Sequence, residues 1–398
     1  LLKNKNIYDE ISNELRKSIN YRGISDVEVG VFLSGGIDSS TNAFFFSKNA
    51  KSKIKTFSIG YDKDYESYSS ELKYARIVAK IIKSSHFEKK LKKDDVKSFI
   101  YDMIYFQDEP ISDPVCIPIY YAAKLAKENN VKVCQVGEGA DEIFFGYTNW
   151  LRTSNINKII NSFFFPKILK IIILKLYKKF NIHYKYSADL IRRSLENKPI
   201  FWGGAEAFSS FEKNELLSPA FKKKINHLDS WDCIEPHYNF FNKKAKFKNI
   251  ENWMTYIDFK IRLPELILMR IDKMTMATGL EARVPFLDHK LIEKTIDLPK
   301  DIKVQGGKLK FILKKIVKKI LPSEIIKRKK QGFGLPLKEW FEDGLGIDEK
   351  KIILDFVKST SFFQEAAIQK IINRKGDTRL WFILNLAIWW EVFIKKVN

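Results

Sequence analysis

The chain has 398 residues, of which 45% are hydrophobic, and a formal net charge of +22. This length allows a substantial buried core and exceeds the usual size of one domain, so we expect one large globular domain with helical additions. The three cysteines, Cys116, Cys134 and Cys233, are far apart and form no C-x-x-C pair, so they suggest neither a disulfide framework nor a zinc site. A reducing, cytoplasmic location fits this cysteine usage.

The positive charge raises nucleic-acid binding as a class of function. Lysine is spread along most of the chain, with only modest clusters at 89–93, 222–224 and 327–330, so it predicts no confined basic surface. Such a composition is typical of an AT-biased coding sequence with solvated lysines. We therefore expect no nucleic-acid partner, and we expect the charge to help attract small anions.

The chain begins with a predicted helix and a predicted strand. Ile7, Ile11, Leu15 and Ile19 recur at spacings of four, which predicts the apolar face of a leading helix within residues 1–25. The apolar run 27–33 predicts a strand buried on both faces. The segment 34–40, Ser-Gly-Gly-Ile-Asp-Ser-Ser, follows as a tight turn and the start of a helix.

This turn is suited to hold pyrophosphate. Gly35 and Gly36 let the backbone approach an anion, and the first N–H groups of the helix point toward it. The lysine of the G-x-x-x-x-G-K-[ST] phosphate loop is missing, and Asp38 takes its place as a carboxylate suited to Mg²⁺. A glycine turn without a ligand is the alternative, which the strand, turn and helix context disfavours.

Residues 26–150 alternate apolar strands, expected at 27–33, 55–60, 85–89 and 131–136, with helices at 71–82 and 117–128. The alternation predicts an α/β fold, a parallel twisted sheet with helices on both faces and ligands at the carboxyl ends of its strands. A second glycine loop, Gly-Glu-Gly-Ala-Asp-Glu at 137–142, follows the last of these strands. Its aspartate alone is equally explained as a helix N-cap.

Residues 151–260 are irregular and aromatic, and we expect a variable helical insertion there. Within it the segment 156–186 is rich in Phe, Ile and Leu, but lysines and Pro166 interrupt it. No charge-free run reaches the roughly 18 residues that a membrane-spanning helix needs. We predict helices that cover the core, with an amphipathic surface helix as the alternative.

Residues 261–398 return to helical patterns at 263–280, 309–320 and 378–393, and we expect them to complete the site. They contain a basic loop at 328–336, Arg-Lys-Lys-Gln-Gly-Phe-Gly-Leu-Pro. Either this loop is simply solvated or one of its lysines points inward. Lys330 is the preferred candidate and Lys329 the second.

In order and approximate spacing, from about residue 10 to about residue 390, these segments resemble the C-terminal synthetase domain of glutamine-hydrolysing asparagine synthetases, with its N-type ATP pyrophosphatase loop. The resemblance implies an adenine nucleotide alpha-hydrolase-like fold. Phe145 departs from the family, which usually has glycine there. The resemblance assigns ATP and pyrophosphate binding to Phe32, Leu33, Ser34, Gly35, Gly36, Asp38, Ser39, Ser40, Ile59 and Gly137.

The resemblance also implies catalytic roles. Asp38 and Asp141 would hold Mg²⁺ between the phosphates. Lys330 would stabilise the charge that develops at the α-phosphate. Glu138 would serve formation of the acyl-adenylate and take a proton from the attacking amine, with a structural salt bridge as its alternative. Asp113 and Arg283 are expected either near the acid substrate or as turn residues.

The reaction so implied is an ATP-dependent amide ligation. Aspartate would be adenylated to β-aspartyl-AMP with release of pyrophosphate, and ammonia, supplied from glutamine, would convert it to asparagine. Because the chain starts at Leu1, we expect a glutaminase domain upstream in the same protein, and a homodimer is left open. One alternative is a related ligase or cyclase for another carboxylate, such as a sugar acid or an antibiotic precursor. A more distant one is an adenylating RNA-modifying enzyme.

Overall fold

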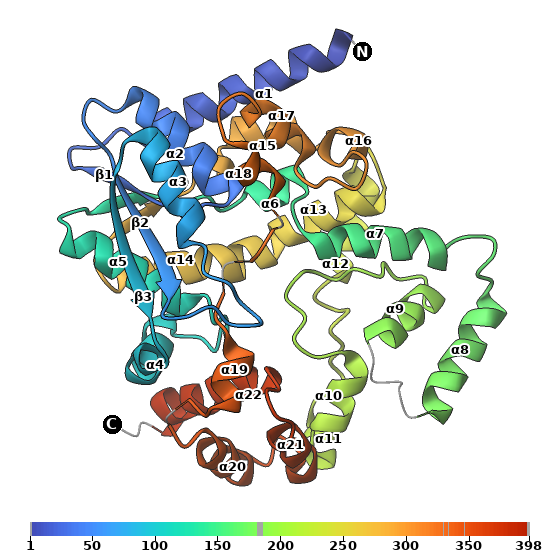
Figure 1. Ribbon diagram of the computed structural model, residues 1–398. Helices are drawn as coiled ribbons and strands as arrows, with labels where there is room; N and C mark the ends of the chain where they lie inside the picture. Colours follow the sequence, from blue (N-terminus) through green and yellow to red (C-terminus); the bar gives the residue numbers. More distant parts are fainter. Residues whose placement is uncertain (1, 181–185, 329, 333, 346, 396–398) are drawn as a thin grey trace.

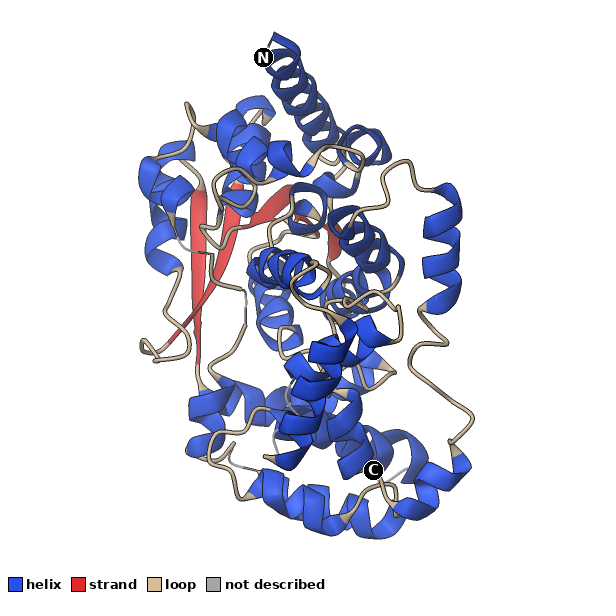
Figure 2. Ribbon diagram, turned by 90° about the vertical axis from the view of Figure 1, so that its right-hand side faces the viewer, coloured by secondary structure: helices blue, strands red, loops and turns tan. Residues whose placement is uncertain are grey.

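A computed structural model describes residues 2–180, 186–328, 330–332, 334–345 and 347–395. Its centre is one sheet of five strands in the order β3-β2-β1-β4-β5, in which every pairing is parallel (Figures 1 and 2). The strands are β1 (Val29–Phe32), β2 (Lys55–Tyr61), β3 (Ser85–Leu91), β4 (Val133–Gln135) and β5 (Glu281–Arg283). The α/β prediction is confirmed.

Two elements of this α/β core, one strand and one helix, differ from the prediction. The edge strand β5 lies in a segment expected to be helical, and it is only three residues long, Glu-Ala-Arg, without an apolar run. It forms because Val133 and its neighbours in β4 supply pairing partners from far away in the sequence. Helix α4 (Lys93–Gln107) was also not predicted, although Val96, Ile100 and Met103 follow helical spacing and are fully buried.

Helices cover both faces of the sheet. On one face lie α1 (Leu2–Tyr21), α2 (Ile37–Asn49) and α3 (Leu72–Ile82), joined by α15 (His289–Thr295) and α17 (Phe311–Val317). Ile11, Leu15 and Ile19 are fully buried there, which confirms the apolar face predicted for the leading helix. The other face carries α4, α5 (Cys116–Glu128) and α14 (Met269–Met276), which contact one another.

The remaining helices surround this core (Figure 1). The predicted helix 263–280 is divided, because the π-helix Leu263–Leu268 precedes α14 and Gly279 forms a turn after it. The C-terminal helices form one lower layer, in which α22 packs against α4 and the others pack around α22. The other elements are α6 (Ala140–Phe144), α7 (Thr148–Ile160), α8 (Lys167–Lys179), α9 (Tyr186–Leu195), α10 (Ser210–Leu216), α11 (Pro219–Lys224), α12 (Glu235–Lys244), α13 (Ile250–Lys260), the 3₁₀ turn Pro285–Leu287, α16 (Lys300–Lys303), α18 (Ser323–Lys327), α19 (Leu337–Glu342), α20 (Glu349–Thr360), α21 (Glu365–Ile372), α22 (Arg379–Trp389) and the π-helix Trp390–Lys395.

Of the segment 156–186, residues 181–185 lie outside the described residues, and the described part does not simply cover the core. Helix α8 packs Ile173 and Leu174 against a small cluster that includes Leu190 of α9, while Ile168 and Ile172 on its outer side are exposed. The alternative, an amphipathic surface helix, therefore describes α8 better than the covering helix we favoured. Among the described helices, none combines the length and the apolar character that crossing a membrane requires.

The strand order places two loops at the same position. Strand β1 lies between β2 and β4. From β1 the chain first adds strands on one side, β2 and β3, and then on the other, β4 and β5, so the loops that follow β1 and β4 diverge and leave a crevice between them. Val31 of β1 pairs with Gln135 of β4, which brings the ends of both strands level. Both predicted glycine loops begin at this point.

Candidate active site

A cavity of about 670 Å³ opens at the carboxyl ends of β1 and β4. Its walls are the loops after these two strands, the start of α3, the first turn of α14 and residues 307–310, 314, 325–328 and 330–332. This volume lies within the usual range for a site that encloses a small-molecule ligand. Most of the predicted binding residues line it: Phe32, Leu33, Ser34, Gly36, Asp38, Ser39, Ile59, Gly137, Glu138, Asp141 and Lys330. Gly35 and Ser40 are not among the lining residues; Gly35 forms the turn and Ser40 is buried in α2.

Hydrogen bonds within the loop after β1 fix its shape. The Ser39 hydroxyl accepts from the Ser34 amide at 3.2 Å, and the two serine hydroxyls lie 3.0 Å apart. Helix α2 starts at Ile37, directly after Gly36, which as a glycine has no side chain to cap the helix. The N-terminal end of α2 and its first amides therefore border the cavity, where an anion is favoured.

Glycine is needed in both loops for steric reasons. Gly35 has φ +72°, and a Cβ there would lie 2.5 Å from the Ala75 backbone nitrogen of α3. Gly137 lies against the other loop, because its Cβ would come within 3.0 Å of the Ser39 amide nitrogen. The two loops thus touch through their backbones, and a side chain at Gly137 would require the Ser39 backbone to shift.

The loop after β4 turns into the short helix α6. Gly139 precedes this helix with φ +89°, and Phe145 ends it in the left-handed region with φ 57°. The family glycine that Phe145 replaces would reach this conformation without strain. Phe145 is nevertheless held, since its ring is buried against Trp150 at a centroid distance of 5.2 Å.

Asp38 and Asp141, one from each loop, share a buried cation. Lys310 forms ion pairs with both carboxylates, at 2.7 Å from Nζ to Oδ1 of Asp141, and its side chain is 5% exposed. Lys330 contacts the same Oδ1 atom of Asp141. The structure therefore brings the two predicted metal ligands together, and it adds a lysine that the sequence did not predict.

Burial and the neighbouring lysines shift the pKa values of Asp38 and Asp141 in opposite directions. Burial raises the pKa of Asp38, and the nearby Lys310 offsets only part of this effect. Burial acts in the same direction on Asp141, but Lys310 and Lys330 outweigh it and lower the pKa of Asp141 to about 2. Burial lowers the pKa of Lys310, yet the two carboxylates more than compensate and raise it. Both Lys310 and Asp141 are therefore charged at neutral pH.

Lys310 has an unusual backbone for a lysine. It stands before α17 with φ 52°, in the left-handed region, where a side chain costs roughly 1 kcal/mol. Gly306 and Gly307 precede it, with φ of 56° and 72°. In the sequence, the sign of this site was a glycine pair followed by Lys308 and Lys310. The predictions for residues 261–398 did not include it.

The basic loop reaches the cavity through Lys330. Its ammonium lies 4.3 Å from the ring centroid of Tyr147 in addition to its contact with Asp141. Arg328 anchors the loop by an ion pair with Glu71, at the start of α3, and by stacking on Tyr74 at 4.3 Å. The second candidate, Lys329, lies outside the described residues.

Glu138 faces an arginine that the sequence did not single out. Arg270 of α14 forms an ion pair with Asp113, and its Nη2 atom lies 3.6 Å from Oε1 of Glu138. Burial raises the pKa of Glu138, with Arg270 acting against the shift. Arg283 does not line the cavity and donates from Nη1 to the backbone carbonyl of Ile24 at 2.7 Å. Of the two roles expected for it, the structure therefore disfavours the one near the acid substrate and gives it a structural role.

The carboxylate pair fits a magnesium ion in a limited way. Within the described ranges, no group of three or more His, Cys, Asp or Glu side chains is arranged to hold a metal. Mg²⁺ in phosphate sites, however, needs only one or two carboxylates besides phosphate and water. Oδ1 of Asp38 is buried and has no hydrogen-bond partner, so it is available for such a role. Asp38 and Asp141 are thus the residues that would hold the ion.

Glu142, next to the carboxylate pair, gives a test of these electrostatics. It is buried, accepts a hydrogen bond of 2.5 Å from the Tyr147 hydroxyl, and has no partner at Oε2. Burial, with a contribution from Asp141, raises its pKa from 4.5 to about 7. Between these pH values the unfolded chain loses a proton that the folded chain keeps, so this group makes folding less favourable as pH rises.

Replacing Glu142 with glutamine is therefore expected to stabilise the protein at pH 8, by about 1–3 kcal/mol, and to change little at pH 4.5. Urea unfolding of both proteins at pH 4.5, 6 and 8 measures the difference. The same change at the exposed Glu128, at the end of α5, is the control and should have little effect at any pH. An equal effect of Glu142→Gln at all three pH values would contradict this view of the site.

Comparison of the sequence with known proteins identifies relatives that cover nearly the whole chain. The chain is 29% identical over 394 residues to asparagine synthetase [glutamine-hydrolyzing] 1 of Bacillus subtilis, covering 97% of this chain and 60% of the relative. It is also 29% identical to a putative asparagine synthetase of Mycobacterium bovis, covering 98% and 58%. A more distant relative, amidase chyE of Penicillium rubens, is 24% identical, with 92% and 58% covered.

The chain thus spans about 60% of the length of these two asparagine synthetase relatives. A model of the asparagine synthase family matches residues 10–391, which include both glycine loops, Lys310 and the basic loop. With the parallel sheet and the cavity at its switch point already described, this match settles the classification: the chain belongs to the asparagine synthase family.

Proposed function

We propose that this chain is the synthetase part of an ATP-dependent amide ligase of the asparagine synthetase type. The observation that carries the proposal is the meeting of two loops from β1 and β4 around one cavity, with Asp38 and Asp141 on one side and Lys330 reaching in from another segment. A carboxylate oxygen of aspartate would attack the α-phosphorus of ATP. The bond to the bridging oxygen would break, giving β-aspartyl-AMP and pyrophosphate.

The loop after β1 would bind the leaving pyrophosphate. Ser34, Gly36 and Ser39 line the cavity at the N-terminal end of α2, where backbone N–H groups and the helix dipole favour an anion. Ile59 and Phe32 would form the apolar wall beside the adenine. Mg²⁺, held by Asp38 and Asp141, would supply charge neutralisation between the phosphates.

Lys330 would stabilise the charge that develops on the α-phosphate. Its side chain is 30% exposed and already in the cavity, and burial beside Lys310 lowers its pKa. Lys310 is instead buried against both aspartates, so its main effect would be to hold the two loops at a fixed separation. We therefore assign the catalytic role to Lys330 and a positioning role to Lys310.

Glu138 would act in the second step, in which ammonia attacks the acyl carbonyl and AMP leaves. The new ammonium group must lose a proton, and a carboxylate with a raised pKa, bordering the cavity, is suited to accept it. Arg270, which lies beside Glu138, would be available to bind a carboxylate of the acid substrate. The contact with Asp113 fixes the orientation of this guanidinium.

The whole protein would have further parts. We propose a glutaminase domain upstream in the same chain that supplies ammonia from glutamine, because the relatives named glutamine-hydrolyzing are longer than this chain. We also propose that the protein acts in the cytoplasm, and a homodimer is compatible with this arrangement. A second candidate is amide formation on another carboxylate, since one relative, 24% identical, is named for an activity other than asparagine synthesis.

The experiment is a product assay with a panel of acids. The chain is incubated with ATP, MgCl₂ and ammonium chloride, with aspartate, glutamate, a sugar acid or no acid, and AMP, ADP and pyrophosphate are measured. We expect aspartate to give AMP and pyrophosphate in equal amounts. Acid-dependent release with a different acid would favour the second candidate, and formation of ADP and phosphate would overturn both.

A further inference from the structure

Helix α8 turns an apolar face toward solvent. Phe163 and Phe164, in the turn before it, are 94% and 88% exposed, and Ile168 at its start is 72% exposed. Ile172, one turn further along, is 46% exposed. Exposed apolar side chains that are scattered singly need no explanation, but here they are consecutive along one turn and one helix face. These residues, with Ile171, Leu176 and Phe180, are called the α8 face below.

The opposite side of α8 is already occupied. Ile173 and Leu174 pack with Leu190 and Ile191 of α9, and Lys170 is buried and donates a hydrogen bond to the Ser194 hydroxyl at 2.8 Å. The helix therefore has one apolar side that meets α9 and a second that meets nothing among the described residues. Rotation about its axis to hide the α8 face would expose the first side.

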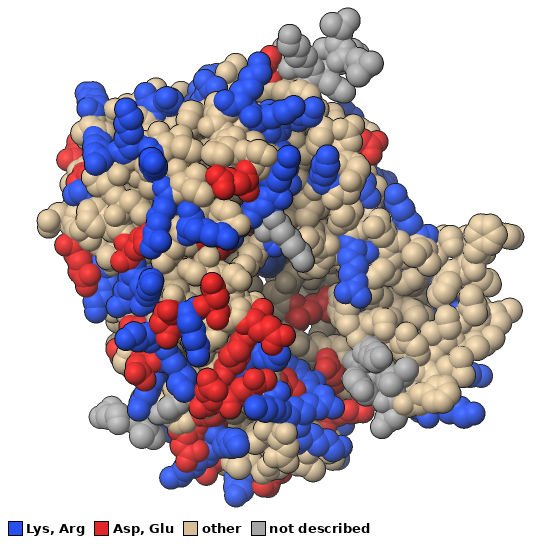
Figure 3. Space-filling model, in the orientation of Figure 1, with Lys and Arg blue, Asp and Glu red and all other residues tan. Residues whose placement is uncertain are grey.

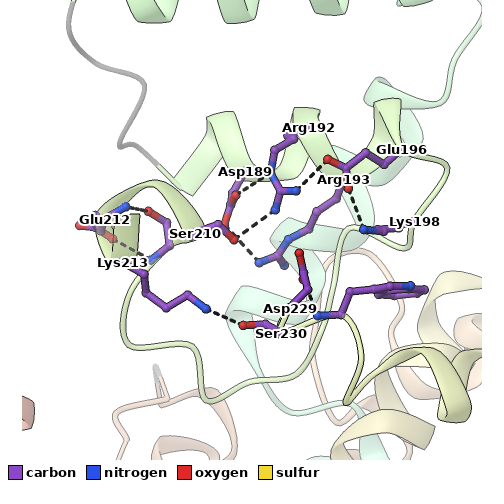
Figure 4. Close-up of polar contacts among 12 residues, drawn as sticks. Asp189, Arg192, Arg193, Glu196, Lys198, Ser210, Glu212, Lys213, Asp229 and Ser230 are labelled. Carbon is purple, nitrogen blue, oxygen red and sulfur yellow. Dashed lines mark hydrogen bonds and ion pairs between the residues drawn. The ribbon is translucent and has the colours of Figure 1, made fainter. Parts of the chain in front are cut away.

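Helix α9 is itself firmly attached, so α8 rests on a fixed support. Arg193 is buried, pairs with Asp189 at 3.3 Å and lies 3.9 Å from the ring centroid of Trp202. Asp189 also accepts from the Ser210 amide at 2.9 Å, which ties α9 to the start of α10 (Figure 4). Arg192 adds contacts to Asp189, Ser210 and Glu196 on the same side of α9.

The charged side chains of α8 itself all have one sign. No acidic residue stands between Glu142 and Asp189 in the sequence. The exposed residues of α8 that are not apolar are lysines, and they lie at both ends of the face and within it: Lys167, Lys175, Lys178 and Lys179. In Figure 3 the lobe on the right, where Figure 1 places α8, is mostly tan with basic groups at its lower end.

We propose that the α8 face binds the surface of a membrane that contains anionic lipids. An apolar strip bordered by lysines is the pattern of helices that lie in the interface plane, with the apolar side chains below the headgroups and the lysines among them. Phe163 and Phe164, at the exposed turn, would enter the layer first. This binding would be peripheral, in keeping with the finding that no described helix could span a membrane.

The observations favour a lipid surface over a second copy of the chain. A twofold interface formed by this face would bring Lys175 and Lys179 of one copy against the same lysines of the other, with no acidic side chain in the segment to compensate. The face is also convex, formed by a single helix and a turn at the edge of the molecule (Figure 1). A deformable anionic layer can surround such a shape.

The test is co-flotation of the full chain with phospholipid vesicles. Vesicles of phosphatidylcholine alone are compared with vesicles that also contain the anionic lipid phosphatidylglycerol, because anionic headgroups attract lysine-rich segments. We expect binding to the anionic vesicles only, with a decrease between 0.1 and 0.5 M salt as charges are screened. The double variant Phe164→Ser/Ile168→Ser should bind at least about tenfold more weakly, because two large apolar side chains no longer enter the layer.

Control variants separate this effect from a general loss of apolar surface. Ile24→Ser and Leu228→Ser remove side chains that are 72% and 63% exposed elsewhere and should leave vesicle binding unchanged. Lys175→Gln/Lys179→Gln should weaken binding to anionic vesicles by roughly 25-fold, from about fivefold for each lysine. Circular dichroism of each variant checks that it is folded.

Three results would overturn the proposal. One is no binding to anionic vesicles by the unmodified chain. Another is equal binding by the Phe164→Ser/Ile168→Ser variant. The third is a dimer in sedimentation experiments that this variant abolishes, which would make the α8 face an interface between copies. None of these measurements depends on the enzymatic reaction, so their failure would leave the proposed function untouched.

Discussion

Replacing Lys330 with alanine is expected to lower the rate of acid-dependent pyrophosphate release by at least about 10²-fold. The lysine ammonium is already in the cavity, in contact with Asp141 and over the ring of Tyr147, so it needs little rearrangement to meet charge at the α-phosphate. Loss of one preorganised group that stabilises a transition-state charge typically costs about 3–4 kcal/mol. The assay is pyrophosphate release at saturating ATP and acid.

Two further variants show whether a lower rate of pyrophosphate release is specific to the Lys330 ammonium. Lys319→Ala removes an exposed lysine just after α17 and should leave the rate within about twofold of the original. Lys330→Arg keeps the charge but changes its shape, and we expect a rate between those of the original and the alanine variant. A rate of Lys330→Ala within threefold of the original, with the protein folded, would remove Lys330 from the mechanism.

The sheet and its two loops were predictable because their signals are local. A buried strand followed by two glycines and a helix start can be read from residues 27–40 alone, and Gly35 indeed has the positive φ that only glycine adopts freely. The loop at 137–142 follows its strand in the same way. The parallel arrangement then places both at one crevice, so Asp38 and Asp141 could be paired before any coordinates were known.

The rest of the site depends on contacts between distant segments. Strand β5 has no strand-like pattern and exists because β4 has a free edge. Arg270 is one of several charged residues on a helix, and only the packing of α14 beside α5 brings it to Asp113 and Glu138. Arg283 was chosen from a motif, yet its side chain turns to the backbone after α1. Side-chain direction of this kind is not encoded in short sequence patterns.

Replacing Lys310 with methionine is expected to lower the free energy of unfolding by about 3–5 kcal/mol at neutral pH. Removing one partner from a buried ion pair leaves the other charge uncompensated, and here Lys310 serves two carboxylates at once. Asp38 and Asp141 would then repel each other, with Lys330 as the remaining lysine in contact with Asp141. Urea unfolding of both proteins at pH 7 measures the loss.

The pH dependence of this difference in the free energy of unfolding gives a sharper test than its size at pH 7. In the original protein the pKa of Asp141 lies at about 2, below its ordinary value of 3.8, so its contribution to stability is complete above pH 4 and disappears as pH falls toward 2. The variant lacks the largest cause of this lowered pKa. We therefore expect the difference between the two proteins to be greatest above pH 4 and to shrink below it.

Lys303 offers a matched control. It is also a buried lysine, 3% exposed, but burial lowers its pKa to about 8, and its ammonium donates to the Ile296 carbonyl and to no carboxylate that the described contacts record. Its charged form thus opposes folding below pH 8, so Lys303→Met should be nearly neutral or stabilising at pH 7. If Lys303→Met and Lys310→Met lower the free energy of unfolding equally, the loss of stability reflects removal of a buried lysine side chain. Opposite signs would instead show that Lys310 stabilises the site by joining the two loops through their carboxylates.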